Sequence, residues 1–309
     1  MVIVYMGTPQ FAVPTLDALV AAGHEVRAVY TQPDRPKGRG QELAISPVKE
    51  AALRHGISVY QPQRIRRPEV VEELRAFNAQ AMVIVGYGQI IPQSILDLPP
   101  LGIINVHASL LPFYRGAAPI QWAIANSETL TGVTTMRIDA GLDTGDMLLR
   151  EETPIGPDET APELSARLAV IGARLCVATL EGLAAGTIQP VPQRHEEATL
   201  APILKKEDGR VDWNRTAVEI HNRLRGFTPW PGAQCEFRRS PLKLHKVQPR
   251  GGSTEAAPGA ILPDRKRLLV ACGGGTILEL LEVQQEGRKK VSSDSFLNGQ
   301  HLTDNDWLT

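Results

Sequence analysis

The sequence has few cysteines and no long apolar run, and both absences narrow the classes of protein that it can encode. Its three cysteines, Cys176, Cys235 and Cys272, lie far apart and form no Cys-x-x-Cys pair, so neither a disulfide framework nor a thiolate zinc site is indicated. No stretch approaches the ~18–20 apolar residues of a membrane span. The apolar segment Met1–Met6 lacks a basic leader and is expected to be a strand rather than an export signal. We therefore expect a cytoplasmic protein without a membrane segment.

Two glycine-rich cofactor motifs are also missing. The first expected turn reads Gly7-Thr8-Pro9 and contains no Gly-x-Gly-x-x-Gly, and no Gly-x-x-x-x-Gly-Lys-[Ser/Thr] loop occurs in the chain. Glycines at those positions let a backbone approach the phosphates of a dinucleotide or a nucleoside triphosphate. Their absence argues against P-loop chemistry and against a Rossmann-type oxidoreductase, which we keep as an alternative.

The composition is that of a soluble globular protein large enough for two domains. Of 309 residues, 42% are hydrophobic and 22% are charged, and single cores tend to stop growing near ~250–300 residues. Residues 1–204 carry 16 basic and 21 acidic side chains, a net charge of -5, whereas residues 205–309 carry 17 and 13, a net charge of +4. A basic C-terminal third allows a polyanionic partner.

In the first part of the chain, short apolar runs alternate with segments of helical spacing. The expected strands are Val2–Met6, Glu25–Tyr30, Ile57–Tyr60, Ala81–Val85, Gly102–His107 and Gly132–Asp139. The expected helices are Val13–Ala22, Ser46–His55, Pro68–Phe77, Gly116–Asn126 and Asp158–Glu181. Because several strands are apolar on both faces, the pattern predicts an α/β domain with a Rossmann-like parallel sheet covered on both sides.

The remainder of the chain has a different pattern. Gly182–Pro202 has little periodicity and is interpreted as a linker. Short expected strands then follow, separated by turn-rich segments: Gln234–Arg238, Leu242–Val247, Leu268–Cys272 and Thr276–Val283. Short strands with long loops indicate a small OB-like β-barrel of the oligonucleotide-binding type. We expect an α/β domain over residues 1–188, a linker over 189–205 and an OB-like domain over 206–309.

Two polar residues share one face at the end of an expected strand. Side chains along a strand repeat with period 2, so Asn105 and His107 point to one side while Ile104 and Val106 point to the other. Open parallel sheets bind their ligands at the carboxyl ends of strands. The pair therefore indicates a site, and the alternative is a hydrogen-bonded turn.

A glycine-rich turn carries three carboxylates, Asp139, Asp143 and Asp146. An oxygen-only metal site usually needs more convergent ligands than one turn supplies, so no metal is expected, and turn chemistry accounts for Asp139 and Asp146. Asp143, at the tip between two glycines, is the candidate for orienting a catalytic histidine.

A basic loop follows the second expected strand. The segment 32–41 is rich in proline and glycine and contains Arg35, Lys37 and Arg39, which predicts a surface segment. It is either a solvated loop or an arm that contacts phosphates.

Seven segments, in order, resemble those of one enzyme family. They are Phe11-Ala12, Thr31-Gln-Pro-Asp34-Arg-Pro-x-Gly38-Arg-Gly40, Ser46-Pro-Val-Lys49, Asn105-Val-His-x-Ser-Leu-Leu-Pro112, Arg115-Gly-Ala-Ala-Pro-Ile-Gln121, Gly141-Leu-Asp-Thr-Gly-Asp146 and Pro229-Trp-Pro231. Together with the basic C-terminal part, they resemble the folate-dependent formyltransferases, and within them the bacterial methionyl-tRNA formyltransferases. The glycinamide ribonucleotide and amino-sugar enzymes resemble the first domain only.

This resemblance implies transfer of a formyl group from 10-formyltetrahydrofolate, the cosubstrate, to the α-amino group of initiator methionyl-tRNA by a monomeric enzyme. Asn105 would orient the formyl oxygen and, with His107, stabilise the oxyanion of the adduct. His107 would move protons between the amine and the departing folate nitrogen, and Asp143 would orient its ring and favour its charged form. Either a water or His107 first deprotonates the amine.

The resemblance also implies binding residues. Folate would lie beside the loop formed by Ser109, Leu110, Leu111 and Pro112. The pterin end would be lined by Gly86, Tyr87, Gly88, Gln89 and Ile90. Arg35, Lys37 and Arg39 would contact tRNA. The competing interpretation is a non-catalytic RNA-binding protein that uses its C-terminal barrel, which would leave Asn105 and His107 without a role.

Overall fold

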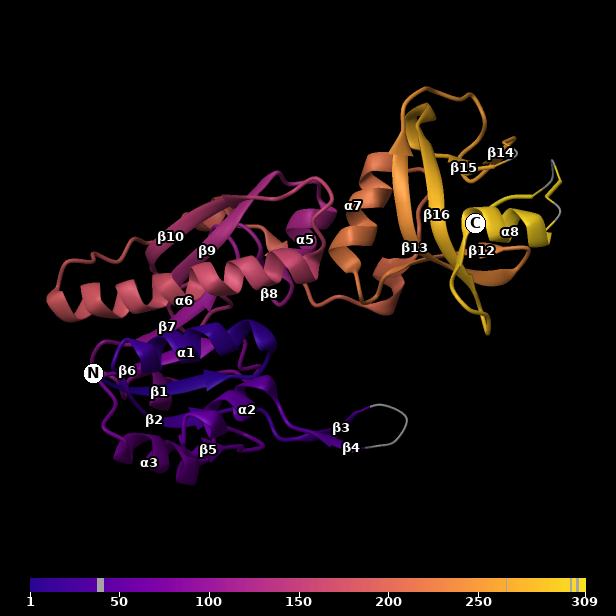
Figure 1. Cartoon of the computed structure of the whole chain (residues 1–309). Coiled ribbons are helices and arrows are strands. Elements are labelled where there is room, and N and C mark those ends of the chain that lie inside the picture. Colours follow the sequence, from indigo (N-terminus) through magenta and orange to yellow (C-terminus); the bar gives the residue numbers. More distant parts are fainter. Residues whose placement is uncertain (38–41, 265, 301, 304–305) are drawn as a thin grey trace. The chain divides into compact units, whose positions relative to one another are not determined.

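The computed structural model describes residues 1–37, 42–264, 266–300, 302–303 and 306–309. The chain forms two compact units (Figure 1). Unit 1 comprises Met1–Pro119, Leu130–Pro154 and Ser165–Ala201. Unit 2 comprises Ile120–Thr129, Ile155–Leu164 and Pro202–Thr309.

Unit 1 is built on a seven-stranded sheet in the order β10-β9-β7-β6-β1-β2-β5. Its strands are β1 (Val2–Gly7), β2 (Glu25–Tyr30), β5 (Val59–Tyr60), β6 (Ala81–Val85), β7 (Ile103–His107), β9 (Leu130–Arg137) and β10 (Met147–Pro154). The helices of the first two thirds of the chain are α1 (Val13–Ala21), α2 (Pro47–Arg54), α3 (Pro68–Ala76), α4 (Gln93–Leu96), α5 (Pro119–Ala125) and α6 (Ala161–Ala185). Most of these bounds lie close to the predicted ranges, but the short helix α4 and the strand β10 were not predicted.

The sheet is parallel only in part. Strands β7, β6, β1, β2 and β5 are parallel to one another, as predicted. β9 pairs antiparallel with β7, and β10 pairs antiparallel with β9. Residues 138–146 connect β9 to β10. A parallel crossover needs a dozen or more residues, so this short connection returns the chain antiparallel.

Helices cover both faces of this sheet (Figure 1). On one face, α3 and α4 pack through Val70, Leu74 and Ile95 against side chains of the central strands. On the other face, α6 lies so close to β7 that a Cβ at Gly172 would lie 2.7 Å from Val106 Cγ1. Glycine at position 172 therefore lets the helix approach the strand.

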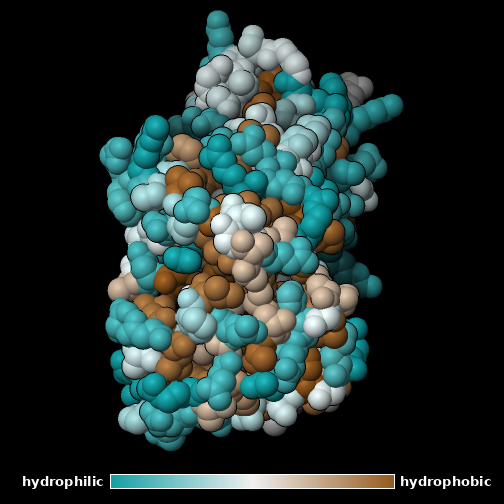
Figure 2. Space-filling model, turned by 90° about the vertical axis from the view of Figure 1, so that its left-hand side faces the viewer, coloured by the Kyte–Doolittle hydropathy of each residue, from teal (hydrophilic) through white to brown (hydrophobic). Residues whose placement is uncertain are grey.

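The sequence led us to expect no segment long and apolar enough to cross a membrane, but the helix α6 meets that description. Among the described residues, α6 is long and apolar enough to cross a membrane by length and composition, with a mean hydropathy of 1.7 in its most apolar window. Half of that window is buried, as befits a helix that covers a sheet. The face of the molecule in Figure 2 is a mosaic of hydrophobic and hydrophilic groups.

The segment predicted as a linker is paired with unit 1 over much of its length. Val191 exchanges two backbone hydrogen bonds with Met147, at 2.8 and 2.9 Å. Further along, β11 (Leu200–Ala201) pairs in parallel with β8 (Arg115–Gly116). Residues 191–201 therefore form a strap that main-chain hydrogen bonds hold at both ends, to β10 at Val191 and to β8 at Leu200–Ala201.

Unit 2 contains a curled antiparallel sheet in the order β12-β13-β16-β15-β14, with β17 on β16. Its strands are β12 (Ala233–Phe237), β13 (Ser240–Arg250), β14 (Ile261–Leu262), β15 (Leu268–Ala271), β16 (Ile277–Gln285) and β17 (Val291–Ser292), and its helices include α7 (Ala217–Phe227) and α8 (Ser293–Gln300). The last residues join the two edges of this sheet, because Leu308 bridges to Phe237, the last residue of β12, and Trp307 bridges to Ala260, next to β14. The C-terminal residues thus close the curled sheet.

An ion pair fixes this closing segment. Arg238 donates from Nε and Nη2 to the two carboxylate oxygens of Asp306, at 2.6 and 2.7 Å. This hydrogen bond holds the pKa of Asp306 at about 2, so its contribution to stability is present above about pH 4 and is lost as the pH falls toward 2.

Asp306→Asn should therefore lower the free energy of unfolding of unit 2 by about 1–2 kcal/mol at pH 7, because the arginine is partly exposed and its charge is screened. Trp122, Trp213, Trp230 and Trp307 are the four tryptophans of the chain, and all belong to unit 2. Denaturant unfolding followed by tryptophan fluorescence measures the change. A difference from the parent protein that stays constant between pH 7 and pH 3 would contradict the role of this carboxylate.

Candidate active site

Asn105 and His107 occupy the end of β7, as the strand periodicity predicts. β7 lies between parallel β6 and antiparallel β9, with Asn105 opposite Ile84 and Met136, and His107 opposite Thr134. Both polar side chains are nearly buried, at 9% and 5% exposure. Strands on both sides therefore hold the amide and the imidazole on the same face of the sheet.

Asp143 joins this pair from the turn between β9 and β10. Its Oδ1 lies 3.5 Å from Asn105 Nδ2, and its Oδ2 lies 3.6 Å from His107 Nδ1. Asp143 Oδ2 also accepts a hydrogen bond from the backbone N–H of Gly116, at 2.8 Å. Asp139 accepts hydrogen bonds from Gly141 N and Thr144 Oγ1, which is the turn chemistry expected for it.

The backbone of Tyr114 orients the imidazole of His107. His107 Nε2 lies 2.9 Å from the carbonyl oxygen of Tyr114. A carbonyl only accepts hydrogen bonds, so Nε2 carries a proton and Nδ1 is the nitrogen that faces Asp143. Tyr114 adopts a positive φ of 59°, a conformation that costs a non-glycine residue about 1–3 kcal/mol. The sequence does not indicate this carbonyl, because a main-chain acceptor leaves no trace in residue type.

Two more buried side chains lie at the turn of Asp143. Arg115 and Gln193 are 6% and 5% exposed, and Gln193 donates to the backbone oxygens of Asp143 and Gly145. Arg115 stood in a motif used only for the resemblance, and Gln193 stood in the expected linker. Neither position carried a local signal of its role.

The loop after β7 is closed by its own hydrogen bonds. Ser109 Oγ donates to Phe113 O at 2.6 Å, and Ser109 O accepts from Thr134 Oγ1 at 2.7 Å. Ser109, Leu111 and Pro112 are buried, and Leu110 is partly exposed. The loop can therefore offer a ligand mainly its shape and the side chain of Leu110.

The segment after β6 has two glycines in left-handed conformations. Gly86 and Gly88 have φ values of 58° and 83°, and a Cβ at Gly86 would lie 2.9 Å from Pro9. Tyr87 is buried, which raises the pKa of its hydroxyl. Gln89 is hydrogen-bonded to the backbone of Ile65 and Pro62, whereas Ile90 is 90% exposed. Backbone groups and Ile90 are thus the parts of this segment that remain accessible.

The basic loop begins and ends in a short hairpin of β3 (Arg35–Lys37) and β4 (Glu42–Ala44). Arg35 is exposed; the side chain of Lys37 and all of Arg39 lie outside the described residues. Lys49 pairs with Asp34 at the base of the hairpin, and this hydrogen bond lowers the pKa of the Asp34 carboxyl.

Both parts of the chain match known families and proteins. Residues 1–180 match the formyl transferase family, and residues 203–301 match the formyl transferase C-terminal domain. A methionyl-tRNA formyltransferase of Solibacter usitatus is 66% identical over 306 residues, covering 99% of this chain and 98% of the relative. One of Koribacter versatilis is 57% identical and covers 97% and 96%.

Solved structures share the fold at lower identity. An N-formyltransferase from Helicobacter canadensis, in complex with folinic acid and dTDP-3-aminofucose, superposes with a TM-score of 0.66 at 18% identity, covering 92% of this chain and 100% of that one. HypX from Aquifex aeolicus, in complex with tetrahydrofolic acid, gives a TM-score of 0.60 at 17% identity, covering 96% and 46%.

These matches confirm the predicted fold class, a Rossmann-like domain followed by an OB-like domain, and exclude both the oxidoreductase and the non-catalytic alternative. The site at the end of β7 lies within the first matched region, and the closed antiparallel sheet lies within the second. The chain therefore belongs to the formyl transferase family in both of its parts.

Proposed function

We propose that this protein transfers the formyl group of 10-formyltetrahydrofolate to the α-amino group of initiator methionyl-tRNA, giving N-formylmethionyl-tRNA for translation initiation. The observation that carries the proposal is the convergence of Asn105, His107 and Asp143 at one strand end in a chain 66% identical to a methionyl-tRNA formyltransferase. The folate compounds named in two structural neighbours support the cosubstrate.

In the proposed reaction, the neutral α-amine attacks the formyl carbon. An α-amine titrates near ~7.7–8.0, so a useful fraction is neutral at pH 7. The new carbon–nitrogen bond produces a tetrahedral adduct with an oxyanion, and the bond from that carbon to the folate nitrogen then breaks. The amine loses one proton overall and the departing nitrogen gains one, so the reaction needs a group that moves a proton between them.

The side chains at the end of β7 fit these requirements. Asn105 Nδ2 is a donor for the oxyanion. His107 Nδ1 is the nitrogen that exchanges protons, since Nε2 is bonded to Tyr114 O. Asp143 lies beside Nδ1 and favours the charged ring that forms when His107 accepts the proton.

Folate binding is assigned to the two segments on either side of β7. The partly exposed Leu110 and exposed Ile90 offer apolar contacts. The glycine backbone at residues 86 and 88 allows main-chain groups to approach a flat heterocycle. The buried side chains of Ser109, Leu111 and Tyr87, and the partly buried side chain of Gln89, would act by holding these segments in shape.

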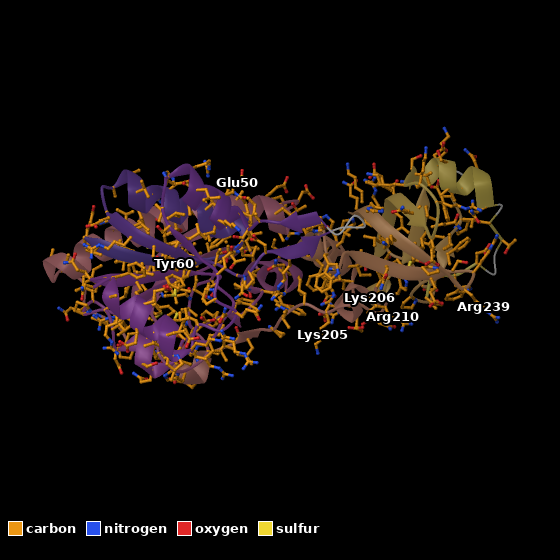
Figure 3. All side chains as sticks on the ribbon, turned by 90° about the horizontal axis from the view of Figure 1, so that it is seen from below. Glu50, Tyr60, Lys205, Lys206, Arg210 and Arg239 are labelled. Carbon is orange, nitrogen blue, oxygen red and sulfur yellow. The ribbon has the colours of Figure 1, made fainter. Side chains whose placement is uncertain are left out.

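Residues 1–188 would form the catalytic domain, residues 206–309 the tRNA-binding domain, and residues 189–205 their connection. The family matches over 1–180 and 203–301 support this division. Exposed basic residues lie at the start of the C-terminal part, where Lys205, Lys206 and Arg210 are close together, and at Arg239 in the β12–β13 turn (Figure 3). Such side chains suit a phosphate backbone.

The protein would work as a cytoplasmic monomer. Its three cysteines are free and buried, as suits a reducing compartment. Light scattering at assay concentration would detect a larger assembly.

The proposed function is tested with purified protein, 10-formyltetrahydrofolate and methionyl-tRNA. We expect formyl-methionyl-tRNA to form, with no product on uncharged tRNA, because the acceptor is the α-amine. Folate turnover with an amino sugar nucleotide but not with methionyl-tRNA would overturn the assignment.

The hairpin of β3 and β4 would place Arg35, Lys37 and Arg39 against the acceptor end of the tRNA. Arg39→Ala should weaken tRNA binding, leave folate binding unchanged, and reduce the slope of log affinity against log salt by about 0.7–0.9 for one lost phosphate contact. Arg75→Ala, an exposed arginine on α3, is the matched control. Equal slopes for the two variants would refute the contact.

A further inference from the structure

The strap of residues 191–201 contacts the turn that carries Asp143. Its ends are fixed by main-chain hydrogen bonds, from Val191 to Met147 and from Arg115 N to Thr199 O at 2.9 Å. Gln193 lies between these two points, and its side chain is 5% exposed. The strap therefore places the buried amide of Gln193 at the turn that carries Asp143.

Every hydrogen-bonding position of this amide is used. Gln193 Nε2 donates to Asp143 O at 2.9 Å and to Gly145 O at 2.7 Å. Gln193 Oε1 accepts from Arg115 Nε at 3.0 Å and from Arg115 Nη2 at 2.6 Å. An amide has two N–H donors and an oxygen with two lone pairs, so Gln193 has no capacity left for substrate.

The residue that Gln193 holds has an uncommon backbone conformation. Asp143 has a positive φ of 51°, in the left-handed region that few non-glycine residues adopt, although aspartate does so more readily than most. The hydrogen bonds from Gln193 flank this residue on the carbonyl side, at Asp143 O and Gly145 O. They stabilise the turn that aims the Asp143 carboxylate at His107.

Arg115, the hydrogen-bond partner of Gln193 Oε1, lies next to the backbone groups that orient His107. Arg115 follows Tyr114, whose carbonyl binds His107 Nε2, and precedes Gly116, whose N–H binds Asp143 Oδ2. The guanidinium of Arg115 is also 3.1 Å from His195 Nδ1 on the same strap. The Arg115 side chain thus connects residues 114–116, whose backbone binds His107 and Asp143, to the strap that carries Gln193.

We propose that Gln193, through Arg115, is a positioning residue that sets the distance between the Asp143 carboxylate and the His107 ring. The proposal rests on the roles assigned to those two residues in the proposed function.

The test is Gln193→Met, which keeps the length of the side chain and removes its amide. A displacement of about 1 Å can cost a catalytic step up to about 10²-fold, so we expect turnover to fall about 10- to 100-fold with the KM for folate nearly unchanged. Gln189→Met, an exposed glutamine that precedes the strap, should keep full turnover.

The pH profile of turnover separates positioning from mere folding. When the Asp143 carboxylate moves away, His107 loses a neighbour that favours its charged form, so the limb of the profile due to His107 should move to lower pH. Loss of folded protein would lower the amplitude and leave that limb in place. Gln193→Leu is the second variant: it also lacks the donors to the two carbonyls and adds no charge, so it should show the same shift.

Turnover of Gln193→Met within twofold of the parent enzyme, or an unmoved pH limb in both folded variants, would overturn the proposal. A parent protein that fails to formylate methionyl-tRNA would instead contradict the proposed function. The two failures are therefore distinguishable in one set of measurements.

Discussion

Replacing His107 with alanine is expected to lower turnover by at least about 100-fold, the lower range for removal of a general acid–base group. The ring is buried at the end of β7 between Tyr114 O and the Asp143 carboxylate. Single-turnover measurement of formyl-methionyl-tRNA would report the proton-transfer step separately from product release. His107→Ala should stay folded, because the backbone pairing of β7 with β6 and β9 does not depend on the imidazole.

The matched control for this variant is His55→Ala. His55 pairs with Asp17 at the surface of unit 1 and has no contact with the site among the described residues. It should keep the turnover of the parent protein. Near-normal turnover of His107→Ala would refute the assignment of proton transfer to this ring.

Replacing Asn105 with alanine should lower turnover by about 10²- to 10³-fold, the effect of removing one oxyanion donor. Its Nδ2 group lies 3.5 Å from Asp143 Oδ1, a long contact that leaves the amide able to turn its N–H groups toward a developing oxyanion. Because this interaction strengthens only in the adduct, the KM for folate should change much less than turnover.

The measurement for Asn105→Ala is the pair of kinetic constants, together with the binding constant for 10-formyltetrahydrofolate. An equal loss in folate binding and in turnover would show that Asn105 holds the ground state rather than the oxyanion. The pH profile should keep its shape, because His107 and Asp143 remain in place, and this distinguishes the variant from Gln193→Met.

The facing pair Asn105 and His107 was predictable because a strand repeats every two residues and the neighbouring apolar residues identify the buried side. The helix bounds were also close to expectation, as at α2, where Ser46 Oγ accepts from Lys49 N at 3.0 Å and Pro47 follows as the first helical residue. These are local relations between residues near each other in the chain.

Asp143 was a weaker inference from the sequence, because three carboxylates stand in one turn and only the fold selects among them. β10 gave no clear pattern, since it is an edge strand whose exposure alternates irregularly. Its antiparallel return from β9 is what brings the Asp143 turn to the end of β7.

By itself, the sequence determined the family, the two kinds of domain and the polar pair at one strand end, because motif order and strand periodicity are properties of the chain. The tertiary structure alone decided how that pair is oriented. The Tyr114 carbonyl, the Gly116 N–H and the Gln193 amide act through hydrogen bonds between segments as much as 50 residues apart. Such contacts involve backbone atoms and an ordinary glutamine, so only the folded chain distinguishes them from any other.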